Sequence, residues 1–512
     1  MTTYKETAKN IVKEAISSAV YIDENAMEPF EETDGNESEE EKMSMYLFNS
    51  FKDEAISLSV LKYTPTQYTT HFNYIFQSRD IVLLDWELEG AGFGGEKALE
   101  ILSEIVCNQH HIHFCAIYTA ENDKDKVLKN IISYFSNTNK TEYEDIRLDL
   151  ESNQSIIDVL PQLNQLILLN DKKKFDEILR NNRKIANEIH DSIKAQNMLC
   201  SLIKCAIAFD DTLCKSNTKL PCLTSFDEKT YTLIIENTII QILNKQETTP
   251  NSLINSLSDN IANYKWGVMQ LLGLEMQNIS RKNSSFVSSE VLHVSKNTLA
   301  YHKKNHGDGF PDFIRNVLIE QNTINLRNEN LLLVESIEEE DKCDSKKELI
   351  EMNVFYNSTI IKSNKNLSFG DVFKVGDNEY YICITALCDC TFPKEKINNS
   401  FFFAKGFSIK PTKVMESAET DFVSFLDEQT AVKWTSDNNG IVPYIKPICF
   451  TIPNNVISGR KIKAFQLDLN GDRKEYDFNY ITTIKQSYAQ RIANHAFAYP
   501  IRVGVDFVKI GN

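Results

Sequence analysis

Acidic and hydroxyl side chains follow three short apolar runs within the first 120 residues. Asp23 and Glu24 come after AVYI, Asp85 comes after IVLL, and Thr119 ends the run HFCAIYT. Carboxylates that gather at one edge raise each other's pKa unless a cation lies between them. Mg²⁺ suits that position because it takes oxygen ligands and usually binds one or two carboxylates. A carboxylate beside this ion can attack a phosphoryl donor to form an acyl phosphate, and a threonine hydroxyl can hydrogen-bond the new oxygens.

The elements that must position these residues form a regular pattern from residue 1 to about 165. Five apolar runs read as strands, namely AISSAVYI, AISLSVLKY, DIVLLDW, HIHFCAIYT and EDIRLDL. Segments of helical periodicity such as EKALEILSEIVCNQ separate the runs. Strands that are apolar throughout are typical of a sheet covered on both faces, so we predict a doubly wound, flavodoxin-like domain with a five-stranded parallel sheet. The acidic residues and Thr119 would then meet at the carboxyl ends of its strands.

The rest of the chain divides into two segments that differ in their pattern of apolar and polar residues. Residues 166–345 are mostly of helical pattern, which predicts a helical middle domain. Residues 346–512 carry short β-branched and aromatic runs, and DVFKVGDNEYYICIT places GDN where a tight hairpin turn is expected. This predicts a β-rich C-terminal domain in the form of a small barrel. Residues 28–41 contain eight acids and no base, which is typical of a solvated insertion.

Composition limits the classes of function. The chain of 512 residues has a net charge of −17, which argues against a whole-protein binder of nucleic acid or of an anionic membrane. No apolar run approaches the ~18 residues of a membrane span. The N-terminus lacks the order of a signal peptide, and the 11 cysteines are scattered singly. We therefore expect a cytoplasmic protein with reduced thiols.

The runs AVYIDEN, DIVLLDWELEG, GGEKALEIL and FCAIYTA together resemble the receiver domain of response regulators, over roughly residues 15–165. The resemblance implies that Asp23, Glu24 and Asp85 hold Mg²⁺, that Asp85 accepts phosphate from a histidine kinase, and that Thr119 reads the phosphorylated state. The family also places a lysine at the end of the fifth strand. This sequence ends the expected fifth strand with LDLES, which puts Asp149 and Glu151 where that cation belongs. The alternative is a receiver-like fold kept as a protein-pairing module.

The C-terminal segment LSFGDVFKVGDNEYYICITALCDC is similar to one in proteins that join a receiver-like domain to a β-barrel tail. Such proteins tend to be encoded beside histidine-kinase-like ATPases in prokaryotic signalling or defence clusters. The resemblance implies a regulator, in two-component signalling or antiviral defence, that acts through a protein partner of that kind. We expect no catalytic turnover beyond phosphate acceptance.

A second hypothesis is a DNA-binding response regulator. Residues 288–305, SSEVLHVSKNTLAYHKKN, resemble a helix-turn-helix in which Ser295 caps the second helix. That helix would enter the major groove, and its candidate contact residues are Lys296, Asn297, Thr298, His302, Lys303 and Lys304. A third hypothesis is an effector enzyme with a site in the C-terminal domain, where the sequence offers no nucleophile and base.

His190 lies in IANEIHD, which is similar to the phosphorylated box of some histidine kinases, but an ordinary exposed histidine explains it as well. Cys383, Cys388 and Cys390 lie close together without a second pair that would complete a zinc site. We expect them to be buried thiols of β-strands.

Overall fold

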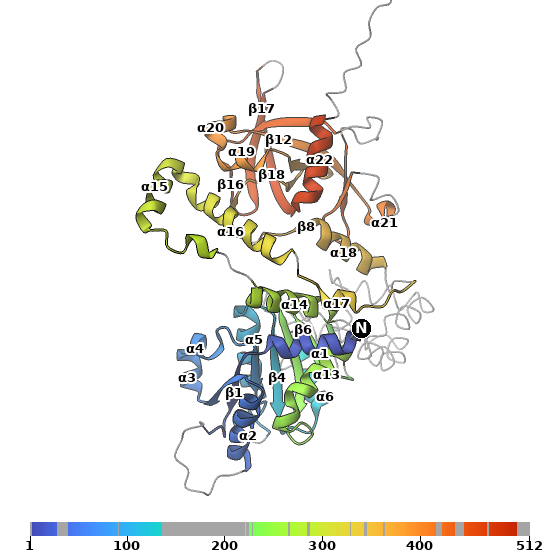
Figure 1. The fold of residues 1–512 in the computed structure, drawn as a ribbon. Helices are drawn as coiled ribbons and strands as arrows, with labels where there is room; N and C mark the ends of the chain where they lie inside the picture. Colours follow the sequence, from blue (N-terminus) through green and yellow to red (C-terminus); the bar gives the residue numbers. More distant parts are fainter. Residues whose placement is uncertain are drawn as a thin grey trace, which may run out of the picture. The chain divides into compact units, whose positions relative to one another are not determined.

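The computed structural model describes residues 3–27, 39–90, 92–135, 221, 225–227, 229–264, 267–283, 287–327, 329–341, 346–361, 364–415, 422–435, 445–467 and 471–498. Two compact units make up the chain (Figure 1). The first consists of Met1–Phe286 and Asn322–Glu338, and the second of Val287–Gln321 and Glu339–Asn512. The expected boundary at residue 165 does not coincide with this division, because later residues also belong to the first unit.

The first unit is built on a mixed sheet. Its described strands run in the order β2-β1-β3-β4-β7-β6-β5. Their bounds are β1 Ser18–Asp23, β2 Ser57–Lys62, β3 Ile81–Leu84, β4 His113–Thr119, β5 Ser225–Asp227, β6 Thr232–Ile235 and β7 Thr238–Asn244. Strands β2, β1, β3, β4 and β7 are parallel, and β6 and β5 continue the sheet antiparallel.

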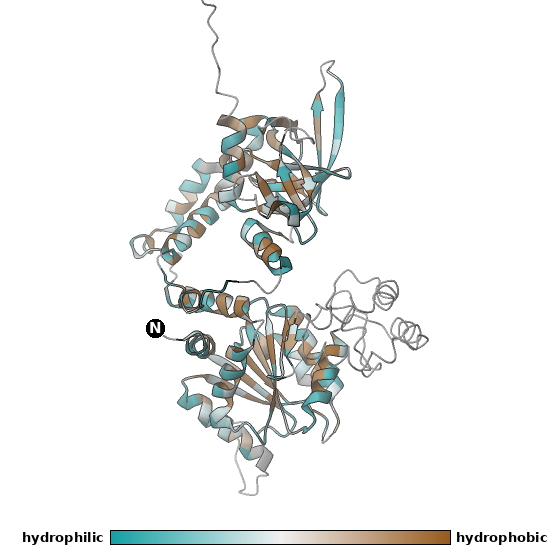
Figure 2. Ribbon diagram, turned by 90° about the vertical axis from the view of Figure 1, so that its right-hand side faces the viewer, coloured by the Kyte–Doolittle hydropathy of each residue, from teal (hydrophilic) through white to brown (hydrophobic). Residues whose placement is uncertain are grey.

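Helices cover both faces of this sheet, as the apolar runs predict. One face packs against α1 (Tyr4–Ala15), α2 (Glu39–Asp53), α13 (Leu253–Asn263) and α14 (Val268–Asn283). The other packs against α4 (Phe72–Phe76), α5 (Gly95–Asn108) and α6 (Lys124–Tyr134), with the short α3 (Pro65–Thr70) beside α4. Figure 2 shows the hydrophobic strands between the helices. The period of two along β1 makes this possible, because Ala19 and Tyr21 join one core while Val20 and Ile22 join the other.

The fifth parallel strand differs from the sequence-based expectation. β7 lies beside β4, with His113 opposite Thr238 and Thr119 opposite Asn244. The prediction that EDIRLDL takes this place is therefore wrong, and residues 136–220 lie outside the described part of the chain. His190 also lies outside the described residues. Strands β5, β6 and β7 come from the segment that we expected to be a separate helical domain.

The second unit contains the predicted small barrel. Strands β11, β10, β18, β17, β15 and β12 pair in that order, and β12 pairs back with β11 to close the ring. Their bounds are β10 Asp371–Val375, β11 Glu379–Cys383, β12 Ser400–Ile409, β15 Pro447–Thr451, β17 Lys461–Leu467 and β18 Arg473–Ile484. The GDN turn joins β10 to β11, and Gly376 takes a φ of +61° there. Buried aromatic rings fill the interior, with Phe403 and Phe478 at 5.2 Å between centroids.

Other elements complete the second unit. Strands β14 (Ala431–Trp434) and β13 (Val423–Phe425) extend the sheet from β12, and β8 (Ser358–Thr359) pairs with β18. The helices include α15 (Lys296–His306), α18 (Lys346–Asn357) and the terminal α22 (Gln486–Ala498), while α16 (Phe310–Leu326) begins in this unit. Among the residues described, no helix is long and apolar enough to cross a membrane.

Candidate functional site

The carboxyl ends of neighbouring parallel strands bring the candidate residues to one edge of the first sheet. Asp23 is the last residue of β1, Asp85 follows β3 directly, and Thr119 is the last residue of β4. Lys245 follows β7, the strand beside β4. In a doubly wound sheet this edge is where ligands bind.

The Lys245 ammonium group lies between two carboxylates. Its Nζ is 2.7 Å from Oδ2 of Asp23 and 2.8 Å from Oδ2 of Asp85. The three side chains are only 12%, 4% and 8% exposed, respectively. Such pairs are screened little by solvent, so the charges act strongly on one another. The lysine that is missing from LDLES is therefore supplied by Lys245, which lies 222 residues after Asp23 along the chain.

The sequence contains a pattern that indicates Lys245, although the segment around it is of helical pattern. The run TIIQILNK is apolar and β-branched and ends in a lysine, which is the expected pattern of a fifth strand and its cation. It lies within a segment of helical pattern, and a short apolar run cannot be assigned to strand or helix by periodicity alone. A search beyond residue 165 for a strand ending in lysine would have found it.

Asp23 is held as a charged carboxylate. Tyr21 donates its hydroxyl to Oδ2 at 2.5 Å, and the Asn25 N–H donates to Oδ1 at 2.7 Å. Burial raises the pKa of this carboxyl, but the Lys245 ammonium and these hydrogen bonds outweigh burial and leave the pKa below its ordinary value. Asp23 is therefore ionised at neutral pH.

Asp85 has a different environment. The Trp86 N–H donates to Oδ1 at 2.7 Å, while Oδ2 faces Lys245. Burial raises the pKa of Asp85 to about 6, helped by the negative charge of Asp23 and opposed by Lys245. The pKa of Lys245 is itself raised, because the two carboxylates more than offset the effect of its burial. Two acids of one site thus differ in their affinity for a proton, as is common where a carboxylate has a chemical role.

Thr119 is fully buried and is joined to the lysine through the backbone. The Lys245 N–H donates to the Thr119 carbonyl at 2.8 Å. The hydroxyl of Thr119 accepts a hydrogen bond from the Glu121 N–H at 3.0 Å. The side chain is therefore fixed within the loop that follows β4, next to the strand that carries the cation.

The residues present fit a magnesium ion. Oδ2 of Asp23 and Oδ2 of Asp85 approach one point closely enough to share an ammonium group, so oxygen ligands already converge on a cation. One or two carboxylates are the usual protein contribution to Mg²⁺. Glu24, the third expected ligand, is half-buried and accepts a hydrogen bond from Asn25 Nδ2 at 3.4 Å. Within the described residues, no three histidine, cysteine or acidic side chains are grouped to hold a metal.

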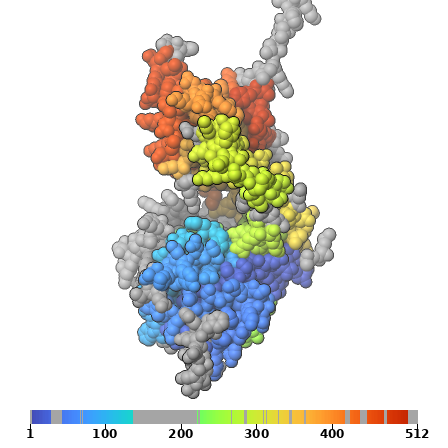
Figure 3. All heavy atoms as spheres, turned by 60° about the vertical axis from the view of Figure 1, so that its left-hand side comes forward, coloured from blue at the N-terminus to red at the C-terminus, as the bar shows by residue number. Residues whose placement is uncertain are grey.

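The six candidate DNA-contacting residues lie together on α15. The helix begins at Lys296 as expected, and Ser295 caps it by accepting a hydrogen bond from the Thr298 N–H at 3.2 Å. Residues 287–305 are all exposed, and the expected first helix is only the short turn η3 (Ser289–Val291). Figure 3 shows α15, in yellow-green, at the surface. The geometry therefore displays the basic residues, but the segment before α15 forms only a short turn instead of the expected first helix. The helix that does contact α15 is α16, whose Phe310 and Phe313 rings lie 5.0 and 5.5 Å from the ring of His302.

Among the three clustered cysteines, Cys383 and Cys390 are buried in the barrel core, while Cys388 is exposed. All three are free thiols. The expectation of buried strand thiols is thus met for Cys383, at the end of β11. It is wrong for Cys388 and Cys390, which lie on the short helix α19 (Leu387–Thr391).

Comparison with known protein families adds an independent finding. Residues 15–167 match the response receiver domain family. Neither the curated proteins nor the solved structures yielded a match to the chain. The family match ends before β7, although β7 completes the parallel sheet and supplies Lys245. A receiver domain indicates a signalling or regulatory role, and this chain carries such a domain as one part of a larger multidomain protein.

Proposed function

We propose that the receiver domain is a working phosphoacceptor and that Asp85 takes the phosphoryl group from a phosphohistidine of a histidine-kinase-like ATPase partner. An Asp85 oxygen would bond to phosphorus while the phosphorus–nitrogen bond breaks, and the histidine nitrogen would keep the electron pair and take a proton. The role is regulatory, in a signalling or antiviral defence pair with that ATPase. The observation that carries the proposal is the placement of Lys245 against Asp85.

The charge balance explains why this lysine matters. Phosphorylation adds a charge of about −1.5 to −2 at neutral pH, which needs a cationic partner in a buried site. The Lys245 ammonium is 2.8 Å from the acceptor carboxylate, and its raised pKa keeps it charged. If only the acids of LDLES lay near Asp85, their negative charge would repel the phosphoryl group of the product. The described geometry supplies the cation instead.

Asp23 and Asp85 would hold Mg²⁺, which when bound supplies further positive charge at the group being transferred. Asp23 is suited to this because its lowered pKa keeps it ionised. The Tyr21 hydroxyl and the Asn25 N–H fix its orientation.

Thr119 would report the change to the rest of the domain. Its hydroxyl now accepts from the Glu121 N–H, and after phosphorylation it would donate to a phosphoryl oxygen. This exchange would move the loop after β4, which is the two-state element that the added charge biases. Thr119→Ala should therefore leave labelling of Asp85 intact and remove the phosphorylation-dependent change in hydrogen exchange of residues 119–123.

The experiment is incubation of the full chain with acetyl phosphate and Mg²⁺, followed by intact-mass measurement. A phosphate adduct is expected on the parent protein and on the control Glu247→Gln, since the Glu247 side chain is 66% exposed and pairs with Lys124. The adduct should be absent from Asp85→Asn. Equal labelling of Asp85→Asn, or no labelling of the folded parent, would refute the proposal.

DNA binding through α15 is a second candidate function. It is favoured by the exposure of a helix that carries Lys296, Lys303 and Lys304 and has no acidic residue. Phosphate contacts by lysines make binding strongly salt-dependent. Fluorescence anisotropy with a DNA duplex should then show affinity that falls steeply with salt and is lost in Lys303→Glu/Lys304→Glu. Binding that is absent, or unaffected by these changes, would exclude α15 as a DNA reader.

A further inference from the structure

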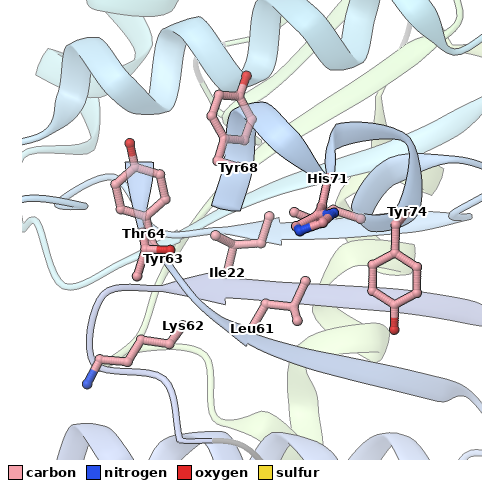
Figure 4. A pocket seen from close by; sticks show the side chains of 9 residues that line it. Ile22, Leu61, Lys62, Tyr63, Thr64, Tyr68, His71 and Tyr74 are labelled. Atoms are coloured by element: carbon pink, nitrogen blue, oxygen red, sulfur yellow. The ribbon is translucent and has the colours of Figure 1, made fainter. Parts of the chain in front are cut away.

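An apolar pocket with a volume of about 290 Å³ opens beside the receiver's acidic edge. It lies between β1, β2 and the helices α3 and α4 (Figure 4). Its floor is aliphatic, from Ile22, Leu61 and Ile75, and its walls are aromatic, from Tyr63, Tyr68 and Tyr74.

The aromatic wall is held in place by neighbouring rings. Tyr68 lies 6.0 Å from Phe72 and 6.1 Å from Phe76 between ring centroids, with edge-to-face geometry in both cases. Phe76 is fully buried, so this part of the wall is anchored in the core of the domain. A preformed aromatic pocket of this kind is typical of small-molecule sites.

The pocket also carries an unsatisfied hydroxyl. The Thr64 oxygen is buried and has no hydrogen-bond partner in the described part of the protein. A buried hydroxyl without a partner costs free energy, which a ligand with a hydrogen-bonding group would recover once the Thr64 side chain rotates its hydroxyl into the pocket. The one lysine of the lining, Lys62, points its ammonium away from the tyrosine rings (Figure 4). Apart from Lys62 and His71 the lining carries no ionisable group other than the tyrosine hydroxyls, so the pocket favours a neutral ligand.

Backbone hydrogen bonds connect the pocket to the acidic site. The Asp85 N–H donates to the carbonyl of Ile22 at 3.0 Å, and the Tyr63 N–H donates to the carbonyl of Asp23 at 2.9 Å. Ile22 and Tyr63 both line the pocket. An occupant would therefore touch the residues whose backbone positions both carboxylates.

We propose that this pocket binds a small, neutral, aromatic molecule that carries one hydrogen-bonding group for Thr64. The volume of about 290 Å³ suits a small ligand, the mostly apolar lining suits a neutral one, and the tyrosine rings favour a planar one. The same ligand would modulate phosphorylation of Asp85, and this second statement rests on the proposed function.

Indole is the probe for the first statement, because it is planar, neutral and has a single N–H donor. Isothermal titration of the full chain should show saturable binding at one site. Leu61→Trp, which fills the pocket, should weaken binding at least tenfold. Thr64→Val, which keeps the shape and removes the hydroxyl, should weaken it about fivefold.

The matched control is Leu467→Trp, which adds the same side chain at a position 67% exposed on the barrel and should leave binding unchanged. Circular dichroism and thermal melting establish that each variant is folded, and Thr64→Val keeps the test valid if Leu61→Trp does not fold. Absence of saturable binding, or equal affinity in parent and both pocket variants, would overturn the assignment. Tighter binding of N-acetyltryptophanamide than of indole would also overturn it, because that result indicates a side chain of a protein partner.

Coupling is measured by the rate of acetyl phosphate labelling with and without saturating indole. A rate change of at least twofold in the parent, absent in Leu61→Trp, is expected. Labelling that is equal in both conditions would refute the coupling but not the pocket. Failure of all labelling would count against the proposed function alone, since indole binding is measured on the unphosphorylated protein.

Discussion

Replacement of Lys245 by methionine should destabilise the receiver domain substantially. The variant keeps the length of the side chain but leaves the carboxylates of Asp23 and Asp85 buried without their cation. Breaking a buried ion pair by removing one partner costs about 3–5 kcal/mol, because the remaining charge loses its compensation. Here a single ammonium serves two carboxylates, so we expect a loss in free energy of unfolding at the upper end of that range at neutral pH.

The loss should depend on pH in a defined direction. Without Lys245, the strongest opposition to the effects of burial and of Asp23 on the pKa of Asp85 is removed, so this pKa should rise above its present value of about 6. A carboxyl whose pKa is higher in the folded state than in the unfolded state binds more protons when folded, and its contribution to stability falls as pH rises. The destabilisation should therefore be larger at pH 8 than at pH 5.5.

Urea titration with hydrogen exchange of peptides from β3 and β4 reports on this unit within the larger chain. The control is Lys282→Met, which removes an exposed ion pair to Glu14 at 2.9 Å and should cost at most about 1 kcal/mol. Mg²⁺ should restore part of the stability of Lys245→Met and none in the control. If Lys245→Met is no more destabilised than Lys282→Met and shows no pH dependence, the inferred charge balance is wrong.

Two further changes test the fold around the site and the barrel. Asp80→Asn weakens hydrogen bonds from Ser17 and an ion pair with Arg281, and urea unfolding should show a loss of about 2 kcal/mol. Burial raises the pKa of Asp80, but these partners outweigh burial and leave the pKa below its ordinary value. The stabilising contribution of Asp80 should therefore be present at neutral pH and lost as pH falls through the folded-state pKa. Equal acid sensitivity of the parent protein and Asp80→Asn would contradict this. Phe478→Ala removes a fully buried ring from the barrel core and should lower the free energy of unfolding of the barrel by about 3–5 kcal/mol. Leu467→Ala, at an exposed position, should lower it little. Similar losses in the two variants would show that the ring cluster is not the core.

Much of the site was predictable because it depends on local patterns. A run that is apolar throughout ends at a polar residue where the chain leaves the sheet, and this placed Asp23, Asp85 and Thr119 correctly at one edge. The hairpin turn at Gly376 and the cap at Ser295 were also readable, because each depends on one residue's conformational or hydrogen-bonding preference.

Lys245 was not predictable in the same way. Adjacent strands in a parallel sheet are joined by crossovers, so proximity along the chain does not reveal which strand lies beside β4. Among the described elements, β5 and β6 come between α6 and β7 along the chain, and residues 136–220 lie outside the described part. The expected fifth strand was the next apolar run, and its acids suggested a lost cation. Only the register of β4 with β7 shows that the cation is supplied from elsewhere.

The aromatic pocket was also not predictable from the sequence, because its lining residues come together only in the folded chain. Ile22, Leu61 and Tyr74 come from three elements, and neither Leu61 nor Tyr74 belongs to a motif. Their common surface arises from how α3 and α4 pack beside β2. The lack of a hydrogen-bond partner for the Thr64 hydroxyl depends on the positions of the neighbouring residues in the fold, which the sequence does not give.

The most direct test of the central claim is to locate the phosphoryl group. The full chain is treated with acetyl phosphate and Mg²⁺, reduced with sodium borohydride, which converts an aspartyl phosphate to homoserine, and mapped by peptide mass spectrometry. We predict homoserine at position 85 in the parent protein and strongly reduced conversion in Lys245→Met. Conversion at another acid, or none at position 85 in a folded protein, would contradict it.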